Sequence, residues 1–423
     1  MANVLYLVHR MPYPPDKGDK VRSYHVLRHL AARHRVFLGT FVDDPADWQH
    51  VPAVRELCAG VHAAGLNPRA ARLRSLAALA TGEPLTLRYY RDAGLARWVK
   101  DAAARERIDA AVVFSSSMAP YAKGLGVPVL VDFVDVDSAK WAEYAPRHAW
   151  PLSWLYRREG EKLLACEREV AGWAGRSFFV TEKEAQLFRG LAPESAGRVE
   201  AMSNGVDCDH FAPDLARPSP FTAGELPVVF TGAMDYWPNI DAVTWFAAEM
   251  LPALRAKHPQ LRFHIVGRNP APAVQALAGT AVNVTGTVPD VRPYLQHAAV
   301  VVAPLRLARG IQNKILEAMA MERPVVAAGT CAEAMAPGTR AELVAAALPD
   351  DYVREVDALL RAPARATAVG IACRQRVLAD YAWDAHLAAF DRHLEAASAA
   401  AAAGLPPPSR NPRPWQPAAG RGG

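Results

Sequence analysis

Cysteine is scarce in this chain of 423 residues: five are present, and no two of them form a Cys-x-x-Cys pair. A zinc ribbon needs such pairs, and a disulfide scaffold needs a denser and more regular set. Both classes of small domain are therefore excluded. The cysteines are expected to be reduced thiols in a cytoplasmic protein, and no metal site is expected.

Long apolar segments are missing as well. No window offers the run of about 18 uncharged apolar residues that a membrane-spanning helix requires. Near the N-terminus, the apolar run at residues 4–8 is short and has no basic region before it. It is expected to form a first strand rather than a signal peptide.

The excess of positive charge is small. The chain has 48 Lys and Arg against 43 Asp and Glu, a net charge of +5. No recognition motif accompanies this charge, so a nucleic-acid partner is not expected. The hydrophobic share of 51% is ordinary for globular proteins, and the length is enough for two or three domains.

Short β-branched runs alternate with helical segments along the chain, and they fall in two series. This pattern predicts parallel sheets built from βαβ units. We therefore expect an α/β fold with two doubly wound, Rossmann-like domains. The expected strands are residues 4–8, 36–41, 110–114, 127–133, 177–180 and 199–202 in the first series, and 228–231, 262–266, 282–285, 300–303 and 324–328 in the second.

Composition indicates where the domains end. Residues 207–226 have the Pro- and Gly-containing composition of a linker. We expect an N-terminal domain over residues 1–206 and a C-terminal domain over residues 207–378. One long helix is expected over about residues 368–397, and its end, residues 379–397, is expected to return to the N-terminal domain. Residues 398–423, rich in Ala, Pro and Gly, are expected to be a disordered tail.

The most informative stretch is residues 300–328, which predicts a strand, a basic loop, a helix beginning near residue 312 and a second strand. On the helix, Asn313, Lys314 and Glu317 lie three and four residues apart and share its polar side. This helix starts at the carboxyl end of a parallel strand, where open α/β sheets bind ligands.

These residues suit a nucleoside diphosphate. Free N–H groups at the helix start, with Arg306, Arg309 and Lys314 nearby, can bind a diphosphate. Glu317 can accept two hydrogen bonds from a ribose diol. The alternative is an ordinary surface pair between Lys314 and Glu317, worth about 0.3 kcal/mol. The other residues expected at the nucleotide are Gly310, Ile311, Gln312 and Asn313.

The sequence GIQNKILEAMAMERPVVA resembles the donor-site signature of retaining GT-B glycosyltransferases of family four. In that signature Glu-x7-Glu is followed by Ala-Met-Ala and then Pro-Val-Val. Three further pieces follow the family's order: a Pro-rich loop with Gly18, NGVD at residues 204–207 and TGTVPD at residues 285–290. The phrases MPYPPDKGDKVRSYH and VDFVDVDSAKW are most similar to sugar transferases associated with exosortase and exopolysaccharide gene clusters.

The resemblance implies a GT-B architecture, with two domains facing a cleft, and a retaining, hexosyltransferase-type activity. It implies a nucleotide-diphosphate sugar as donor, no separate cofactor, and a lipid-linked or polysaccharide acceptor in the N-terminal domain. It places Gly18 and Gly232 at the donor, Val288 beside the base and Glu317 at the ribose. Gly18, Gly232 and the segment around Val288 can equally be ordinary turns.

The chain departs from the family pattern in two places. Arg309 stands where the first Glu is expected, and a guanidinium cannot accept hydrogen bonds. Arg309 is therefore expected at the diphosphate or at an anionic sugar. The loop after residues 228–231 lacks the family's basic pair, so Arg306, Arg309 and Lys314 are expected to supply the cations. The Arg309 departure motivates one alternative, a non-catalytic nucleotide-sugar-sensing scaffold. A second alternative, a nucleotide-sugar 2-epimerase of the same fold, needs acids around a sugar carbon, so Arg309 disfavours it.

Charged residues also gather at two places in the first half. Lys20 and Arg22 open a helix against its dipole, which requires an anion or nearby aspartates as compensation. Asp135 and Asp137 follow the strand at residues 127–133, where a carboxylate can position an acceptor hydroxyl. The alternative is a helix N-cap role for Asp137 or Ser138.

Two segments bear on a membrane partner. Residues 69–107 combine an excess of positive charge with Leu, Tyr and Trp, and residues 141–173 contain four Trp. Both suit peripheral contact with the anionic surface of the inner membrane face. Packing of these helices on the sheet of the N-terminal domain is the alternative.

Overall fold

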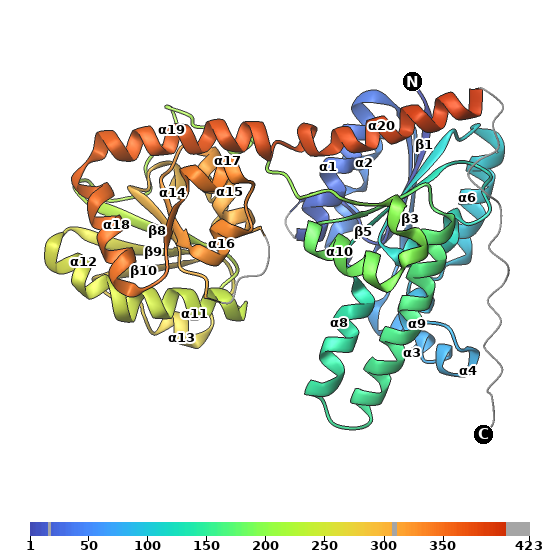
Figure 1. The fold of residues 1–423 in the computed structure, drawn as a ribbon, viewed down its shortest axis with the longest axis horizontal. Helices are drawn as coiled ribbons and strands as arrows, with labels where there is room; N and C mark the ends of the chain where they lie inside the picture. Colours follow the sequence, from blue (N-terminus) through green and yellow to red (C-terminus); the bar gives the residue numbers. More distant parts are fainter. Residues whose placement is uncertain (16–17, 307–310, 403–423) are drawn as a thin grey trace. The chain divides into compact units, whose positions relative to one another are not determined.

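The computed structural model describes residues 1–15, 18–306 and 311–402. It divides into two compact units, each with one parallel sheet and helices on both of its faces (Figure 1). Unit 1 comprises Met1–Ser203 and the C-terminal segment from Leu387 onward, and unit 2 comprises Asn204–His386.

The sheet of unit 1 is entirely parallel and has the strand order β3-β2-β1-β4-β5-β6-β7. The first strand of the chain lies in the interior of this sheet, between β2 and β4, and its residues Val4 to Val8 are fully buried. A strand buried on both faces explains why this run is apolar without alternation. The strands are β1 (Asn3–Val8), β2 (Arg35–Val42), β3 (Gly60–Gly65), β4 (Ala110–Phe114), β5 (Val129–Val134), β6 (Arg176–Phe179) and β7 (Val199–Ala201).

The helices of unit 1 connect these strands, and the last one returns from the C-terminal part of the chain. Four 3₁₀ turns accompany them, η1 (Pro45–His50), η2 (Ser116–Met118), η3 (Ala145–Arg147) and η4 (Pro193–Arg198). The α-helices are α1 (Gly18–Arg33), α2 (Val51–Leu57), α3 (Pro68–Ser75), α4 (Ala78–Thr81), α5 (Leu85–Tyr89), α6 (Ala93–Arg105), α7 (Ala119–Ala122), α8 (Asp137–Tyr144), α9 (Leu152–Trp173), α10 (Glu182–Leu191) and α20 (Trp383–Ala402).

Unit 2 repeats the plan with the strand order β10-β9-β8-β11-β12-β13. Its strands are β8 (Leu226–Thr231), β9 (Leu261–Val266), β10 (Val282–Gly286), β11 (Val300–Ala303), β12 (Val325–Ala328) and β13 (Val344–Ala346). Its helices are α11 (Trp237–Trp245), the π-helix η5 (Phe246–Met250), α12 (Leu251–Lys257), α13 (Pro272–Gln275), α14 (Arg292–Gln296), α15 (Asn313–Ala320), α16 (Gly329–Glu333), α17 (Pro337–Glu342), α18 (Pro349–Arg361) and α19 (Pro363–Asp380).

Each sheet has a switch point, where the chain reverses the direction in which it adds strands. In unit 1 it lies between β1 and β4, and in unit 2 between β8 and β11. Loops leave these neighbouring strands in opposite directions, so a crevice opens at their carboxyl ends, where doubly wound proteins bind ligands. The two switch points are therefore the first places to look for a site.

The predicted α/β fold with two Rossmann-like sheets is confirmed. All eleven expected strands are present with ends that agree within two residues. Two edge strands were not predicted: β3 has the sequence GVHAAG, and β13 is three residues long. Glycine and alanine have low β propensity, so neither run stands out in the sequence.

The C-terminal helical pattern is interrupted where one helix was expected over about residues 368–397. Helix α19 ends at Asp380, and α20 begins at Trp383. Between them, the carbonyl of Tyr381 accepts a hydrogen bond from the N–H of Val206. Helix α20 continues to Ala402 and so includes the first five residues of the expected tail, 398–402, because the alanine-rich run favours helix. Residues 403–423 lie outside the described residues.

Helix α20 packs on unit 1 through aromatic and polar contacts. The rings of Phe178 and Phe390 lie 4.9 Å apart. Nε2 of His29 lies 3.0 Å from Oδ1 of Asp391, and Nε2 of His393 lies 3.1 Å from the carboxylate of Glu200. These contacts join the end of the described chain to strands and helices formed by its first half.

Two buried ion pairs fix the start of α1. Arg22 bonds Asp132 of β5 with Nε 2.7 Å from Oδ2, and Nζ of Lys20 lies 2.8 Å from Oδ2 of Asp47. All four side chains are buried. Carboxylates from elsewhere in unit 1 thus provide the compensation that these cations require, since buried charges are retained when paired.

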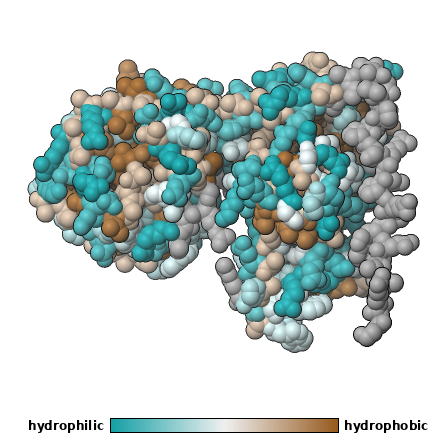
Figure 2. Space-filling view, in the orientation of Figure 1, coloured by the Kyte–Doolittle hydropathy of each residue, from teal (hydrophilic) through white to brown (hydrophobic). Residues whose placement is uncertain are grey.

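Hydrophobic and hydrophilic residues are mixed over the visible surface of both units (Figure 2). The most apolar elements, the strands, are covered by helices, and so they do not contribute to this surface.

Candidate functional site

Two glycines shape the carboxyl ends of the neighbouring strands β8 and β9 in unit 2. Gly232 follows β8 with φ +155°, which side chains rarely adopt. A Cβ here would lie 2.8 Å from Nδ2 of Asn239 and 2.9 Å from Nζ of Lys314. Gly267 follows β9, and a Cβ there would collide with the carbonyl oxygen of Gly232. Only glycine at both positions allows this close approach of backbone and polar side chains.

Lys314 is held in place by Asn239. Its Nζ donates to Oδ1 of Asn239 over 2.5 Å and lies 4.2 Å from the ring centre of Phe230. Asn239 is buried in the first turn of α11, and its Nδ2 donates to the carbonyl of Ala233 over 2.8 Å. The amine from α15 is thereby fixed at the end of β8.

Burial shifts the ionisation of both charged residues of α15. Desolvation lowers the pKa of Lys314 to about 7, although the neighbouring Glu317 opposes this shift. Desolvation also raises the pKa of Glu317 to about 7, against the effect of Lys314. Within residues 311–402 and 18–306, no ion pair joins the two side chains. The alternative of an ordinary surface pair is therefore not what the structure contains, because both side chains are half-buried beside the switch point.

Arg306 already has a partner. Its Nε donates to Oδ2 of Asp241 over 3.0 Å, a second bond joins Nη2 to Oδ1, and the guanidinium lies 4.8 Å from the ring centre of Trp245. It would bind a diphosphate only by sharing its charge with Asp241. Arg309 and Gly310, also expected at the nucleotide, lie outside the described residues.

The remaining residues expected at the nucleotide lie along the same edge of the sheet. Asn313 is the first residue of α15, Gln312 precedes it as N-cap, and Ile311 packs half-buried on the core. Val288, after β10, is half-buried on the same core. Gly286, with φ +68°, ends β10 at a register shift between β10 and β9.

In unit 1, the acids after β5 pair with a lysine. Nζ of Lys140 donates to Asp135 over 2.7 Å and to Asp137 over 3.2 Å. Val136, not Asp137, is the N-cap of α8. Glu184 accepts from the N–H of Val136, and Glu167 accepts from Ser138. Asp137 is thus not needed as a cap, and desolvation raises its pKa.

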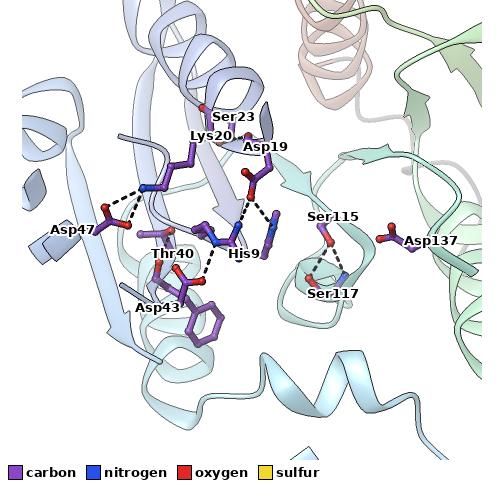
Figure 3. A network of polar contacts seen from close by, with 12 residues as sticks. His9, Asp19, Lys20, Ser23, Thr40, Asp43, Asp47, Ser115, Ser117 and Asp137 are labelled. Carbon is purple, nitrogen blue, oxygen red and sulfur yellow. Dashed lines mark hydrogen bonds and ion pairs between the residues drawn. The ribbon is translucent and has the colours of Figure 1, made fainter. Parts of the chain in front are cut away.

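A polar network at the switch point of unit 1 was missed in the sequence (Figure 3). His9 and Arg10 follow β1 directly. Nη1 of Arg10 lies 2.6 Å from Asp19, and its Nε lies 2.9 Å from Asp43. A histidine immediately after the first strand was the available signal, but its partner Asp19 lies in another element.

No group of three or more His, Cys, Asp or Glu in residues 1–15, 18–306 and 311–402 is placed to hold a metal ion. None of the helices in the same ranges has both the length and the apolar character to cross a membrane.

Residues 225–362 match the family model described as Glycosyl transferases group 1. This segment contains Gly232, Asn239, Lys314 and Glu317. A sequence comparison with curated proteins finds no match.

Solved structures resemble the chain over nearly its whole length. Sucrose-phosphate synthase from Thermosynechococcus elongatus is 18% identical with a TM-score of 0.63, covering 94% of this chain and 100% of its own. HepE from Anabaena, in complex with UDP, is 14% identical with a TM-score of 0.63, covering 93% and 100%. WaaG, a glycosyltransferase involved in lipopolysaccharide biosynthesis, is 16% identical with a TM-score of 0.60, covering 92% and 99%. The chain has a GT-B-like fold.

Proposed function

We propose that the protein is a retaining glycosyltransferase that moves a sugar from a nucleotide-diphosphate donor to a lipid-linked or polysaccharide acceptor in exopolysaccharide biosynthesis. One observation carries the proposal: the switch point of unit 2 joins Lys314 to Asn239 beside the backbone of Gly232, inside the segment that the glycosyl transferase model matches. A desolvated amine next to open backbone is suited to a diphosphate.

Lys314 is proposed to contact the donor diphosphate, with Gly232 allowing the phosphates to approach the backbone. Glu317, one turn along α15, is proposed to accept hydrogen bonds from the ribose hydroxyls, and Val288 to border the base. A dianionic ligand raises the pKa of Lys314, so the amine is protonated when the donor is bound. Gly18 and Asp135 of unit 1 are proposed to serve the donor and the acceptor.

The chemical step consists of one displacement. The bond between the anomeric carbon and the diphosphate breaks, and the acceptor oxygen bonds to that carbon from the same face. The acceptor's proton passes to the departing diphosphate. The charge that develops on the leaving group lies beside the ammonium of Lys314, so stabilisation of that charge is the main contribution proposed for the protein.

A thermal-shift comparison of UDP, GDP, ADP and TDP tests the donor site. UDP comes first because HepE was solved with UDP and with UDP-glucose. A ligand at about 100 times its Kd adds roughly 2.7 kcal/mol to the free energy of unfolding. Glu317→Gln and Lys314→Gln should lose most of this gain. Lys257→Gln, which removes the ion pair between α12 and Asp357, should keep it. No stabilisation by any nucleotide would contradict the proposal.

Turnover separates the enzyme from its alternatives. Release of sugar from the bound nucleotide's sugar conjugate, lost in Lys314→Gln, supports the transferase. Binding without turnover would favour the sensing scaffold, and an epimeric product formed without acceptor would favour the 2-epimerase.

We also propose peripheral contact with an anionic membrane. The exposed leucines Leu73, Leu76 and Leu79 of the α3–α4 segment support it, together with Trp150 and Trp154 near the start of α9. In contrast, the aromatic residues at 89, 90 and 98 pack against the core. Flotation with vesicles containing acidic phospholipid tests the contact. Binding that the pair Trp150→Ser and Trp154→Ser abolishes would support it, and absence of flotation would exclude it.

A further inference from the structure

The switch point of unit 1 holds a histidine whose ring is fixed from two sides. His9 follows β1, and its ring stacks on Phe114 at 5.8 Å with an interplanar angle of 6°. Tyr90 meets the same ring edge-on at 5.6 Å and 87°. The two aromatic contacts fix the plane of the imidazole ring, and within that plane its two nitrogens have different surroundings.

The surroundings of the two nitrogens indicate which of them carries the proton of the neutral ring. Nδ1 of His9 is buried with no hydrogen-bond partner among the described residues. Nε2 faces Oδ2 of Asp19 at 3.7 Å. Burial lowers the pKa of His9 to about 4 although Asp19 opposes this shift, so the ring is neutral at physiological pH. A neutral ring carries one proton, and the nitrogen that faces a carboxylate is the favoured place for it.

The distance between the two groups matters for what they can bind. At 3.7 Å, Nε2 and Oδ2 are too far apart for a hydrogen bond with each other. A hydroxyl oxygen about 2.8 Å from both atoms can accept from Nε2–H and donate to the carboxylate. The side chains of His9 and Asp19 are 16% and 31% exposed, so a ligand can reach them. A donor and an acceptor side by side match the two functions of one hydroxyl group.

Charge in the network excludes an anionic ligand. Arg10 bonds both Asp19 and Asp43, and His9 is neutral, so one positive charge faces two negative charges. A phosphate would be repelled, whereas an uncharged sugar would not.

The residue that follows the neighbouring strand β4 contributes a further hydroxyl group. Phe114 pairs in register with Val8, so Ser115 and His9 both lie one residue beyond their paired strands (Figure 3). Ser115 has φ +75°, which is strained for a residue with a side chain, and its Oγ lies 3.0 Å from Oγ of Ser117. Such strain is concentrated at functional sites.

We propose that His9 and Asp19 together bind a hydroxyl group of an uncharged acceptor sugar at the switch point of unit 1, with the half-buried Ser115 making a further hydroxyl contact. The hydroxyl site rests on this geometry alone; that its ligand is the acceptor rests on the proposed function.

NMR of the full chain labelled with 15N-histidine tests the site. The signals of His9 are identified as those lost in His9→Asn, and the signals of His62 are identified in the same way with His62→Asn. The His62 signals serve as the matched control because His62 also stacks on an aromatic ring, Trp98, in unit 1. The probes are the methyl glycosides of glucose, galactose, mannose and N-acetylglucosamine. At least one should shift the Nε2 signal of His9 and leave that of His62 unchanged.

Asp19→Asn is the sharper variant. The asparagine oxygen can still accept from Arg10, but the amide turns a donor toward the hydroxyl, so the sugar's affinity should fall at least about tenfold. A His9 signal that none of the sugars moves would overturn the proposal, as would a shift caused by inorganic phosphate instead. UDP binding, measured on the same sample, tests the donor site separately from the hydroxyl site. If a sugar shifts the His9 signal but UDP does not bind, only the proposed donor site is contradicted.

Discussion

Nζ of Lys314 lies 2.5 Å from Oδ1 of Asn239, and through this contact α15 supplies the cation that the loop after β8 lacks. That loop, residues 232–236, contains no Lys or Arg. Asn239 is held in turn by its bond to the carbonyl of Ala233. The position of the amine is therefore set by a neutral residue, which leaves the positive charge available to a ligand.

Asn239→Asp should weaken nucleotide binding by about tenfold or more. The carboxylate keeps the contact with Lys314 but adds a negative charge that competes with the diphosphate, and it cannot donate to the carbonyl of Ala233. Calorimetric titration with UDP measures the change. Asn283→Asp, on β10 beside His264, is the matched control and should alter affinity less than threefold. Equal affinities for wild type and Asn239→Asp would refute this role.

Gly232→Ala should lose nucleotide binding while the protein still folds. The added methyl group lies under 3 Å from side-chain atoms of Asn239 and Lys314, which can move, so stability should fall by only about 1–3 kcal/mol. Gly267→Ala meets the backbone of Gly232 instead and should cost more. Thermal melts with and without UDP distinguish these outcomes. Gly279→Ala, where nothing lies within 4 Å of the new atom, should resemble wild type.

Lys314→Met should change how stability depends on pH in the free protein. The folded pKa of Lys314, about 7, lies below its ordinary value of 10.5. Between these values the unfolded chain binds more protons, so the free energy of unfolding of the wild type rises with pH. The variant lacks this rise, and relative to wild type it should lose up to about 1 kcal/mol per pH unit above pH 7.

Glu317→Gln should change the pH dependence of the free energy of unfolding in the opposite direction. The folded pKa of Glu317, about 7, exceeds its ordinary 4.5, so the wild type loses stability as pH rises from 4.5 to 7. The variant should gain relative to wild type over that interval. Denaturant titrations at several pH values measure both trends. Profiles parallel to wild type would show that neither group is desolvated as described.

Arg306→Gln should affect nucleotide binding less than Lys314→Gln. Its guanidinium already bonds Asp241 and stacks on Trp245, so most of its charge is neutralised without a ligand. We expect a loss of less than about threefold in UDP affinity against more than tenfold for Lys314→Gln. The reverse ranking would make Arg306 the principal cation of the site.

The sequence predicted the scaffold well, because apolar strands and the helix after β11 are encoded locally. The polar face of α15 was also visible from spacing alone. What spacing cannot show is a partner in another element: Lys20 and Arg22 look like candidates for an anion until Asp47 and Asp132 are seen beside them.

The same limit explains the two residues that were missed. Asn239 gains its role from contact with Lys314, 75 residues later in the chain. His9 gains its role from Asp19 and from two rings that belong to other elements. Strand edges with weak propensity, such as β3, were lost for the separate reason that pairing, not local sequence, makes them strands.

The return of α20 to unit 1 has a consequence for biosynthesis. Unit 1 is encoded in two pieces, and the piece from Leu387 onward follows all of unit 2. A ribosome working at about 5–20 residues per second needs roughly 10–40 s to translate the intervening segment. During that time Phe178 and Glu200 lack their contacts with α20, whereas the sheet of unit 2 can already form. The first unit to be synthesised is thus the last to be completed, and a chaperone that binds exposed apolar surface would meet it in this interval.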